Sequence, residues 1–137
     1  MGNRAVITAS KSLTKGVGIY LHWNGGLESV QAFLDVAKAR GFRDPSGDES
    51  YAIARLIGLI HEFFGTHDST SLGVGTLDQL DCDNYDNGVY VIGQDWKVID
   101  RWGKGSKPYS VGDEHFVKQD PQYIGIVEQL TGKKEEA

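Results

Sequence analysis

The feature that most constrains the fold is an alternating apolar run that ends in two glycines and passes directly into a helical pattern. Residues 17–23 alternate apolar and polar side chains, which predicts a strand. Gly25 and Gly26 end this strand, and apolar residues then recur at helical spacing over residues 27–40. A strand that turns straight into an amphipathic helix predicts a domain in which a helix packs against a sheet.

The rest of the chain shows the same mixture of patterns. We expect further strands at residues 4–8, 72–77, 89–92 and 96–102, and helices at residues 50–64 and 121–130. The last two strands form a predicted antiparallel hairpin, because Gly93-Gln94-Asp95 is a short connection that contains a residue able to adopt positive φ. Helix 50–64 is apolar over more than one stripe, which predicts deeper burial than for helix 27–40.

This order of elements predicts an α+β fold. Two main helices are expected to pack on one face of a largely antiparallel sheet, with a short helix near the C-terminus. A chain of 137 residues can bury one core, so we expect a single domain over residues 1–130. The charged residues 131–137 are expected to form a mobile tail.

Charge and hydropathy exclude several classes of function. The net charge of −5 argues against binding of long nucleic acid, whose affinity depends on many Lys and Arg side chains. A small nucleotide remains compatible, since two or three arginines can bind its phosphates. No apolar stretch approaches the roughly 18 residues that a membrane helix needs, and Cys82 has no second cysteine to pair with. These features, with no apolar signal segment after Met1, predict a cytoplasmic protein that does not bind membranes.

The junction between strand 17–23 and helix 27–40 is the first candidate site. Glycines allow close approach of a ligand, and the unpaired amides at a helix N-terminus suit an anion. Asn24, Gly25 and Gly26 supply this combination. The alternative is structural: Asn24 or Gly26 caps the helix and binds nothing.

A polar segment at residues 81–88 is the second candidate site. Its carboxylates and amides suit a divalent cation, but the spacing rejects an EF-hand because Tyr85 falls on a ligand position in either register. The segment is therefore interpreted either as a turn with residues 87–88 in left-handed conformations, or as a rim that binds ribose hydroxyls or a base edge. The side chains that would form this rim are Asn84, Asp86 and Asn87.

Arg55 lies in the largely apolar helix 50–64, where burial of an unpaired charge is costly. It therefore needs a partner, which is either a carboxylate such as Asp48 or Glu62, or the phosphate of a ligand. The aromatic residues are expected to form mostly core or interface, although one of them can stack on a base.

Metal-binding and catalytic patterns are missing from the sequence. The histidines at positions 22, 61, 67 and 115 show no metal-ligand spacing, so no metal or other cofactor is expected. There is no His-Glu-x-x-His motif, nucleophile elbow or phosphate loop, and Cys82 is interpreted as a small buried side chain. We therefore expect no enzymatic activity.

Four segments together resemble the phage-encoded Thoeris anti-defence proteins. They are GIYLHWNGG at 18–26, YAIARL at 51–56, FFG at 63–65 and DNYDNGVY at 83–90, and the resemblance covers about residues 3–101. It implies a homo-oligomer that binds cyclic signalling nucleotides, such as cyclic ADP-ribose isomers or small cyclic oligonucleotides. Such a protein sequesters its ligand without cleaving it.

The resemblance also implies which chemical groups meet the ligand. Arginines would contact the diphosphate, an aromatic ring would stack on the adenine, and amides or carboxylates would bind ribose hydroxyls, in pockets that often lie between subunits. The residues assigned to these roles are Arg55, Arg101, Asn84, Asp86, Asn87, one of Phe63, Phe64 or Tyr90, and Asn24 and Gly25 at the junction.

Two other functions stay open. A protein-interaction inhibitor of a host defence factor fits the acidic charge, although no acidic block marks its surface. A nucleotide hydrolase would use His22 with Asp83 or Asp86 as an acid–base pair, although no spacing supports it.

Overall fold

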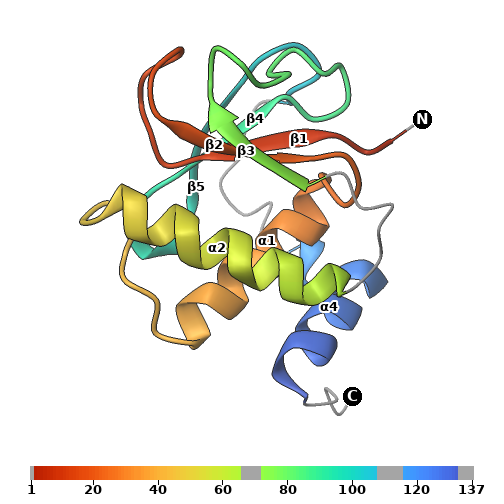
Figure 1. Ribbon diagram of the computed structural model, residues 1–137. Coiled ribbons are helices and arrows are strands. Elements are labelled where there is room, and N and C mark those ends of the chain that lie inside the picture. The colour runs from red at the N-terminus through yellow and green to blue at the C-terminus, as the bar shows by residue number, and fades with distance from the viewer. Residues whose placement is uncertain (1, 66–71, 108–115, 133–137) are drawn as a thin grey trace.

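The computed structural model describes residues 2–65, 72–107 and 116–132 (Figure 1). From its composition, the sequence also predicts a surface loop at residues 65–71 and a polar, flexible stretch at residues 103–112. These two regions and the expected tail at 131–137 lie partly outside the described residues. The first residues of the expected tail are described, and they complete and cap the last helix.

A five-stranded sheet in the order β3-β2-β1-β4-β5 forms one layer of the structure (Figure 1). Its strands are β1 (Ala5–Thr8), β2 (Val17–Leu21), β3 (Leu72–Thr76), β4 (Val89–Ile92) and β5 (Val98–Trp102). Only β1 and β4 run parallel, and the other three neighbouring pairs are antiparallel. The prediction of a largely antiparallel sheet is therefore confirmed.

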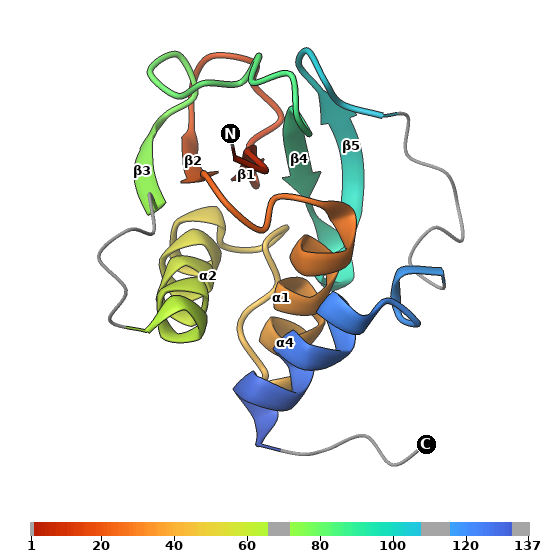
Figure 2. The same ribbon diagram turned by 90° about the vertical axis from the view of Figure 1, so that its right-hand side faces the viewer.

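Three α-helices within the described residues lie on one side of this sheet (Figure 2). They are α1 (Leu27–Ala39), α2 (Glu49–Phe64) and α4 (Pro121–Thr131). Asp48 caps α2 by accepting a hydrogen bond from the amide of Tyr51, and Asp120 caps α4 by accepting one from Gln122. The α+β class, with two main helices and a short C-terminal one, is confirmed.

The main core lies between the sheet and the helices. Phe33 and Leu34 of α1, Leu56 and Ile60 of α2, and Tyr90 of β4 are all fully buried there. A smaller cluster, made of Val6, Leu77, Val89 and Val91, packs on the opposite face of the sheet. Both faces of the central strands β1 and β4 are therefore covered, which agrees with their continuously buried patterns.

Helix α1 is more deeply buried than α2, so the prediction that residues 50–64 form the more buried helix is wrong. Eight residues of α1 are buried, compared with five of α2. The physical reason is position, because α1 packs extensively against α4 as well as against α2, whereas α2 contacts α4 only slightly (Figure 2). The apolar pattern of a single helix does not show how many neighbours cover it.

The β4–β5 hairpin is present, but its connection differs from the expected one. A short 3₁₀ turn, η1 (Gln94–Trp96), precedes β5, and positive φ occurs at Asp95 (62°) and Trp96 (57°), whereas Gly93 has a φ of −152°. The Trp96 indole N–H donates to the carbonyl of Phe42 over 3.1 Å, which anchors the turn to the end of α1. Positive φ thus falls on Asp95, inside the expected connection, and on Trp96, which this tertiary contact holds in place.

Gly25 is required by close packing between the start of α1 and the N-terminal strand. Its amide donates to the carbonyl of Asn3 over 2.8 Å, and its own carbonyl accepts a 2.7 Å hydrogen bond from the Tyr90 hydroxyl. A Cβ atom at Gly25 would lie 2.5 Å from the Asn3 carbonyl oxygen and 2.8 Å from Cβ of Ala5. The backbone at this point has no room for a side chain.

Replacing Gly25 by Ala should therefore destabilise the fold. We expect the free energy of unfolding to fall by about 1–3 kcal/mol, because backbone atoms must move to admit the new methyl group. Gly125→Ala in α4 is the matched control, since nothing lies within 4 Å of its added Cβ, and it should raise stability by about 0.5–1 kcal/mol. Urea unfolding measures both, and equal stability of Gly25→Ala and wild type would contradict the packing argument.

Candidate functional site

A polar cavity of about 390 Å³ lies at the N-terminus of α1, where this helix meets β4, β5 and the loop that precedes β4. Its walls combine both charge signs with amide groups and the first turn of the helix. The polar side chains in the walls are Asn3, Glu28, Asp86, Asn87, Arg101 and Lys107. The cavity brings together four residues that the sequence assigned to a ligand site, namely Asp86, Asn87, Tyr90 and Arg101.

Arg101 is the central cation of this cavity. Its guanidinium carbon lies 4.2 Å from the ring centroid of Tyr90, and its Nη2 donates to the carbonyl of Asn87 over 2.8 Å. Among the described residues, its Nε is the single buried side-chain nitrogen or oxygen without a hydrogen-bond partner. A buried donor on a charged group is costly when unpaired, so an acceptor supplied by a ligand would stabilise it.

Tyr90 holds Arg101 in place instead of offering a surface for stacking. The residue is fully buried, its hydroxyl donates to Gly25, and Arg101 covers its ring. Burial raises the pKa of Tyr90 well above its ordinary value, so the hydroxyl stays protonated and keeps donating. A base therefore cannot stack on this ring without displacing Arg101.

Asn84 lies inside the loop at residues 81–88, with 1% of its surface exposed. Its Oδ1 accepts hydrogen bonds from the amides of residues 86–88, and its Nδ2 donates to the carbonyls of Asp81 and Gly88. Every hydrogen-bonding group of the side-chain amide is used within the loop. Asn84 thus shapes the cavity wall without facing the cavity.

Asn87 joins this loop to the N-terminal segment. Its Nδ2 donates to Oδ1 of Asn3 over 2.7 Å and to the carbonyl of Arg4 over 2.9 Å. The left-handed residues of the loop are Tyr85 (φ 63°) and Gly88 (φ 66°), so the expectation that residues 87 and 88 both take this conformation is correct only for Gly88.

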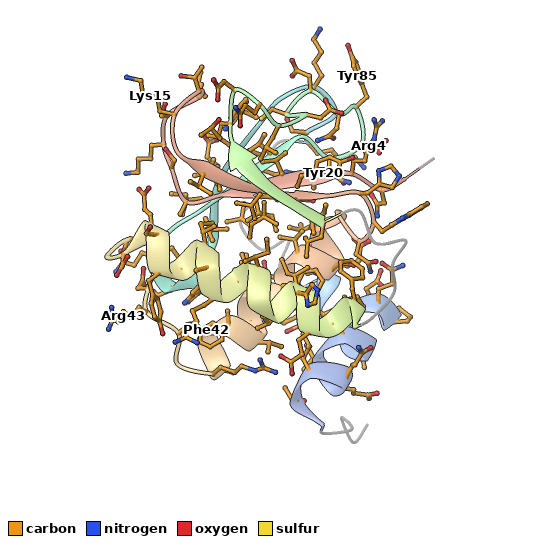
Figure 3. All side chains as sticks on the ribbon, viewed as in Figure 1. Arg4, Lys15, Tyr20, Phe42, Arg43 and Tyr85 are labelled. Carbon is orange, nitrogen blue, oxygen red and sulfur yellow. The ribbon has the colours of Figure 1, made fainter. Side chains whose placement is uncertain are left out.

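Asp86 is paired with Arg4 at the rim of the cavity. Its Oδ2 accepts from both the backbone amide and the Nε of Arg4, over 3.0 and 2.8 Å. These hydrogen bonds, that of the side chain above all, hold the pKa of Asp86 below its ordinary value. Figure 3 shows Arg4 next to Tyr20 on the side of the sheet away from α2. Asp86 therefore stays ionised at neutral pH, with its charge paired to Arg4.

Arg55 lies away from this cavity, exposed on α2, with its guanidinium carbon 5.1 Å from the ring centroid of Tyr51. The carboxylates proposed as its partners bind other arginines: Asp48 pairs with Arg43 at 3.4 Å and Glu62 with Arg40 at 2.7 Å. The expectation of a buried charge in this helix is wrong, because position 55 falls on the solvent side of α2.

Phe63 and Asn24 also lie outside the cavity walls. The Phe63 ring packs edge-on against Phe33, with 5.4 Å between centroids, and borders the main core. Asn24 adopts a φ of 60° and donates to Oγ of Ser29, while Gly26 is the N-cap residue of α1 and forms no side-chain cap. The sequence did not point to Asn3, Glu28 or Lys107, since none of them lies in a recognisable motif.

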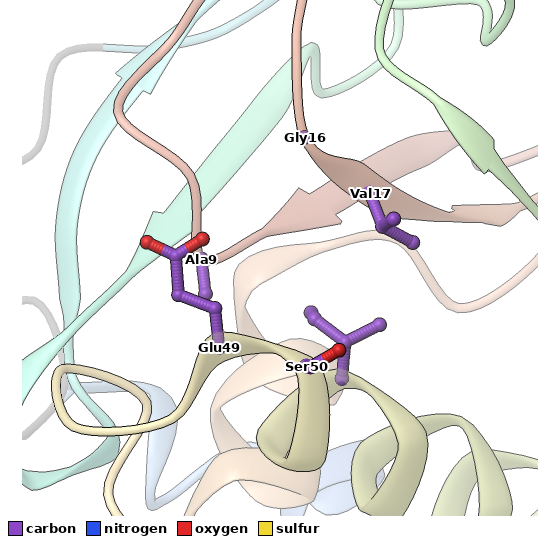
Figure 4. Close-up of a pocket in the computed structure, with 6 residues that line it drawn as sticks. Ala9, Gly16, Val17, Glu49 and Ser50 are labelled. Atoms are coloured by element: carbon purple, nitrogen blue, oxygen red, sulfur yellow. The ribbon is translucent and has the colours of Figure 1, made fainter.

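A second hollow lies at the N-terminus of α2 and has different chemistry (Figure 4). Ala9, Gly16 and Val17 form one wall and Glu49, Ser50 and Ile53 the other, around about 220 Å³. The carboxylate of Glu49 is the one ionisable group among these residues, so this hollow does not suit a phosphate.

The described residues provide neither a metal-binding site nor a reactive cysteine. They contain no group of three or more His, Cys, Asp or Glu side chains that would hold a metal ion, and His67 and His115 lie outside them. Burial raises the pKa of Cys82, whose Sγ donates to the carbonyl of Leu77 over 3.4 Å. No helix in these ranges is long and apolar enough to cross a bilayer.

Comparisons with protein-family models, curated proteins and solved structures find no match to this chain. The resemblance to the Thoeris anti-defence proteins therefore stays a prediction. Function is best inferred from the chemistry of the cavity around Arg101.

Replacing Asp86 by Asn tests the charge pairing at the rim. Because the pKa of Asp86 is lowered in the folded protein, its carboxylate stabilises the fold above the ordinary pKa of about 3.9 and stops doing so as the pH falls through the folded value. At pH 7 the variant should therefore unfold at lower urea concentration than wild type. This difference should shrink as the pH falls from about 5 towards about 2, and a difference independent of pH would contradict the assignment.

Proposed function

We propose that this chain binds a small cyclic nucleotide in the cavity at the N-terminus of α1 and sequesters it without cleavage. The observation that carries the proposal is Arg101, which lines that cavity and whose buried Nε has no hydrogen-bond partner among the described residues. The resemblance to the Thoeris anti-defence proteins adds the ligand class and, with it, a place of action in the cytoplasm of a host cell.

A phosphate suits one side of the cavity. Arg101 offers a planar guanidinium, Lys107 adds a second positive charge, and the first turn of α1 adds the positive end of the helix dipole. Arginine holds phosphate oxygens through two parallel hydrogen bonds when two of its donors face the ligand. Nη2 already donates one hydrogen bond to the carbonyl of Asn87, so Nε and the remaining N–H groups of the guanidinium are the donors assigned to the phosphate.

Hydroxyl groups suit the other side of the cavity. The carboxylate of Glu28 can accept and the amide of Asn3 can donate hydrogen bonds to a ribose, whereas the negative charge of Glu28 would repel a bare anion. Asp86 keeps its negative charge because Arg4 lowers its pKa. This mixture favours a phosphorylated sugar over inorganic phosphate.

Two titratable groups in the cavity walls are poorly suited to act as a catalytic base. The raised pKa of Tyr90 removes it as a base, and the Asp86 carboxylate is occupied by Arg4. The hydroxyl of Tyr20 lies 3.0 Å from Nδ1 of His22, and neither residue belongs to the cavity walls. A second copy of the chain would supply the aromatic face for the base, in line with the homo-oligomer that the resemblance implies.

Mass spectrometry of retained ligand tests this function. Purified protein is incubated with cyclic ADP-ribose isomers and small cyclic oligonucleotides, separated from free ligand and heat-denatured. We expect an intact nucleotide to be released. A cleaved product would support the hydrolase, and no retained nucleotide would overturn the proposal and favour a protein partner.

Two variants locate the binding site. Arg101→Ala and Lys107→Ala should each weaken binding about 10- to 100-fold, since a hydrogen bond to a charged group contributes about 1.5–3 kcal/mol. Arg55→Ala and Lys97→Ala are matched controls, because both residues are exposed and lie outside the cavity walls. Circular dichroism checks folding, and full binding by Lys107→Ala and Arg101→Ala would place the ligand elsewhere.

A further inference from the structure

We infer that the outer edge of β3 is where two copies of this chain pair, antiparallel and centred on Val74. The inference concerns the opposite edge of the sheet from the cavity and does not rest on the proposed function. It names a second copy as the occupant of an edge that no other described strand of the monomer covers.

Within the part of the chain that the structure describes, strand β3 is an unprotected edge strand. All five of its residues pair with β2 on one side, and within the described residues no strand pairs with it on the other. Its sequence, Leu-Gly-Val-Gly-Thr, contains no charge and no proline. Such an edge presents free N–H and C=O groups that form hydrogen bonds with another strand.

The opposite edge strand, β5, is protected in the ways that discourage such pairing. It carries the charged residues Asp100 and Arg101 in its centre, and its register with β4 is irregular between Val91 and Ile92. Charged side chains and irregular pairing both block the addition of a further strand. Of the two edge strands, β3 is therefore the one that can accept a strand from a second copy.

The sequence of β3 is complementary to itself. Antiparallel pairing about Val74 places Val74 opposite its own copy and Gly73 opposite Gly75. Val74 is 52% exposed although it pairs directly with the core residue Ile19, and so points to the helix face of the sheet. A second copy would bury this side chain against the same side chain of its partner.

A groove beside β3 continues this surface onto α2. It encloses about 520 Å³ between Val74 and Gly73 of the strand and Ala54, Gly58 and His61 of the helix. No Asp, Glu, Lys or Arg side chain lines it. This matters because residues close to a two-fold axis meet their own copies, and the chain carries a net charge of −5. The neutral groove is a surface where two acidic chains can meet without repulsion.

The size of the helix residues also fits a second copy. Paired edge strands lie about 4.8 Å apart, so the two copies of α2 would come close to each other, and the distance between packed helices depends on the side chains at the contact. Ala54 and Gly58 lie one turn apart on α2, and nothing lies within 4 Å of a Cβ added at Gly58. The small side chains at positions 54 and 58 leave room for the second copy of α2.

Oligomeric state tests the inference directly. Analytical ultracentrifugation of the full chain at about 100 μM should show a dimer. Gly58→Glu should raise the dissociation constant of the dimer at least tenfold and so favour the monomer. The reason is that the new carboxylate lies in the groove, close to the same carboxylate of the second copy. Gly125→Glu is the matched control, since Gly125 also lies in a helix with open space around it, and it should stay dimeric. A monomeric wild type would overturn the inference.

Cross-linking tests the register independently of folding effects. In a Cys82→Ala background, Val74→Cys should form a disulfide-linked dimer on mild oxidation, because directly opposite Cβ atoms lie about 4.5–5.5 Å apart. Thr76→Cys should not, since pairing about Val74 separates the two copies of residue 76 by four residues, or about 13 Å. Equal cross-linking at both positions, or a dimer that Gly58→Glu leaves intact, would overturn the proposed interface.

Discussion

The hydrogen bond from the Tyr90 hydroxyl to the Gly25 carbonyl is the contact on which the candidate site depends. It ties the centre of β4 to the turn that starts α1, and it forms only because Gly25 lets that turn lie against the backbone of Asn3. The same tyrosine ring supports the guanidinium of Arg101 from β5. One buried side chain therefore sets the distance between the helix N-terminus and the cation that faces it.

The rest of the cavity is built from hydrogen bonds that join distant parts of the sequence. Asn84 closes the loop before β4, and Asn87 and Asp86 then attach this loop to Asn3 and Arg4 at the start of the chain. These polar groups use most of their bonding capacity on one another. Arg101 Nε is the exception within the described residues, and this is why the cavity is interpreted as a ligand site instead of a structural polar cluster.

Local patterns predicted the strands and helices well, because their apolar periodicity survives tertiary packing. What they missed depends on contacts between distant residues. Gly25 was interpreted as part of an anion site, whereas its role is to admit the N-terminal backbone. Because α2 is largely apolar in composition, Arg55 was expected to be buried, yet position 55 lies on the exposed side of that helix. The turn at Asp95 and Trp96 follows from the anchoring of Trp96 to Phe42.

The order of strands separates the two surfaces that the proposals use. Three strands lie between β3 at one edge of the sheet and β5 at the other, so a dimer formed through β3 leaves both Arg101 cavities on its outer sides (Figure 2). Pairing at β3 therefore cannot supply the aromatic face that a nucleotide base would need beside Arg101. If a second copy does supply it, the chain must use two different interfaces, and the functional assembly must be larger than a dimer.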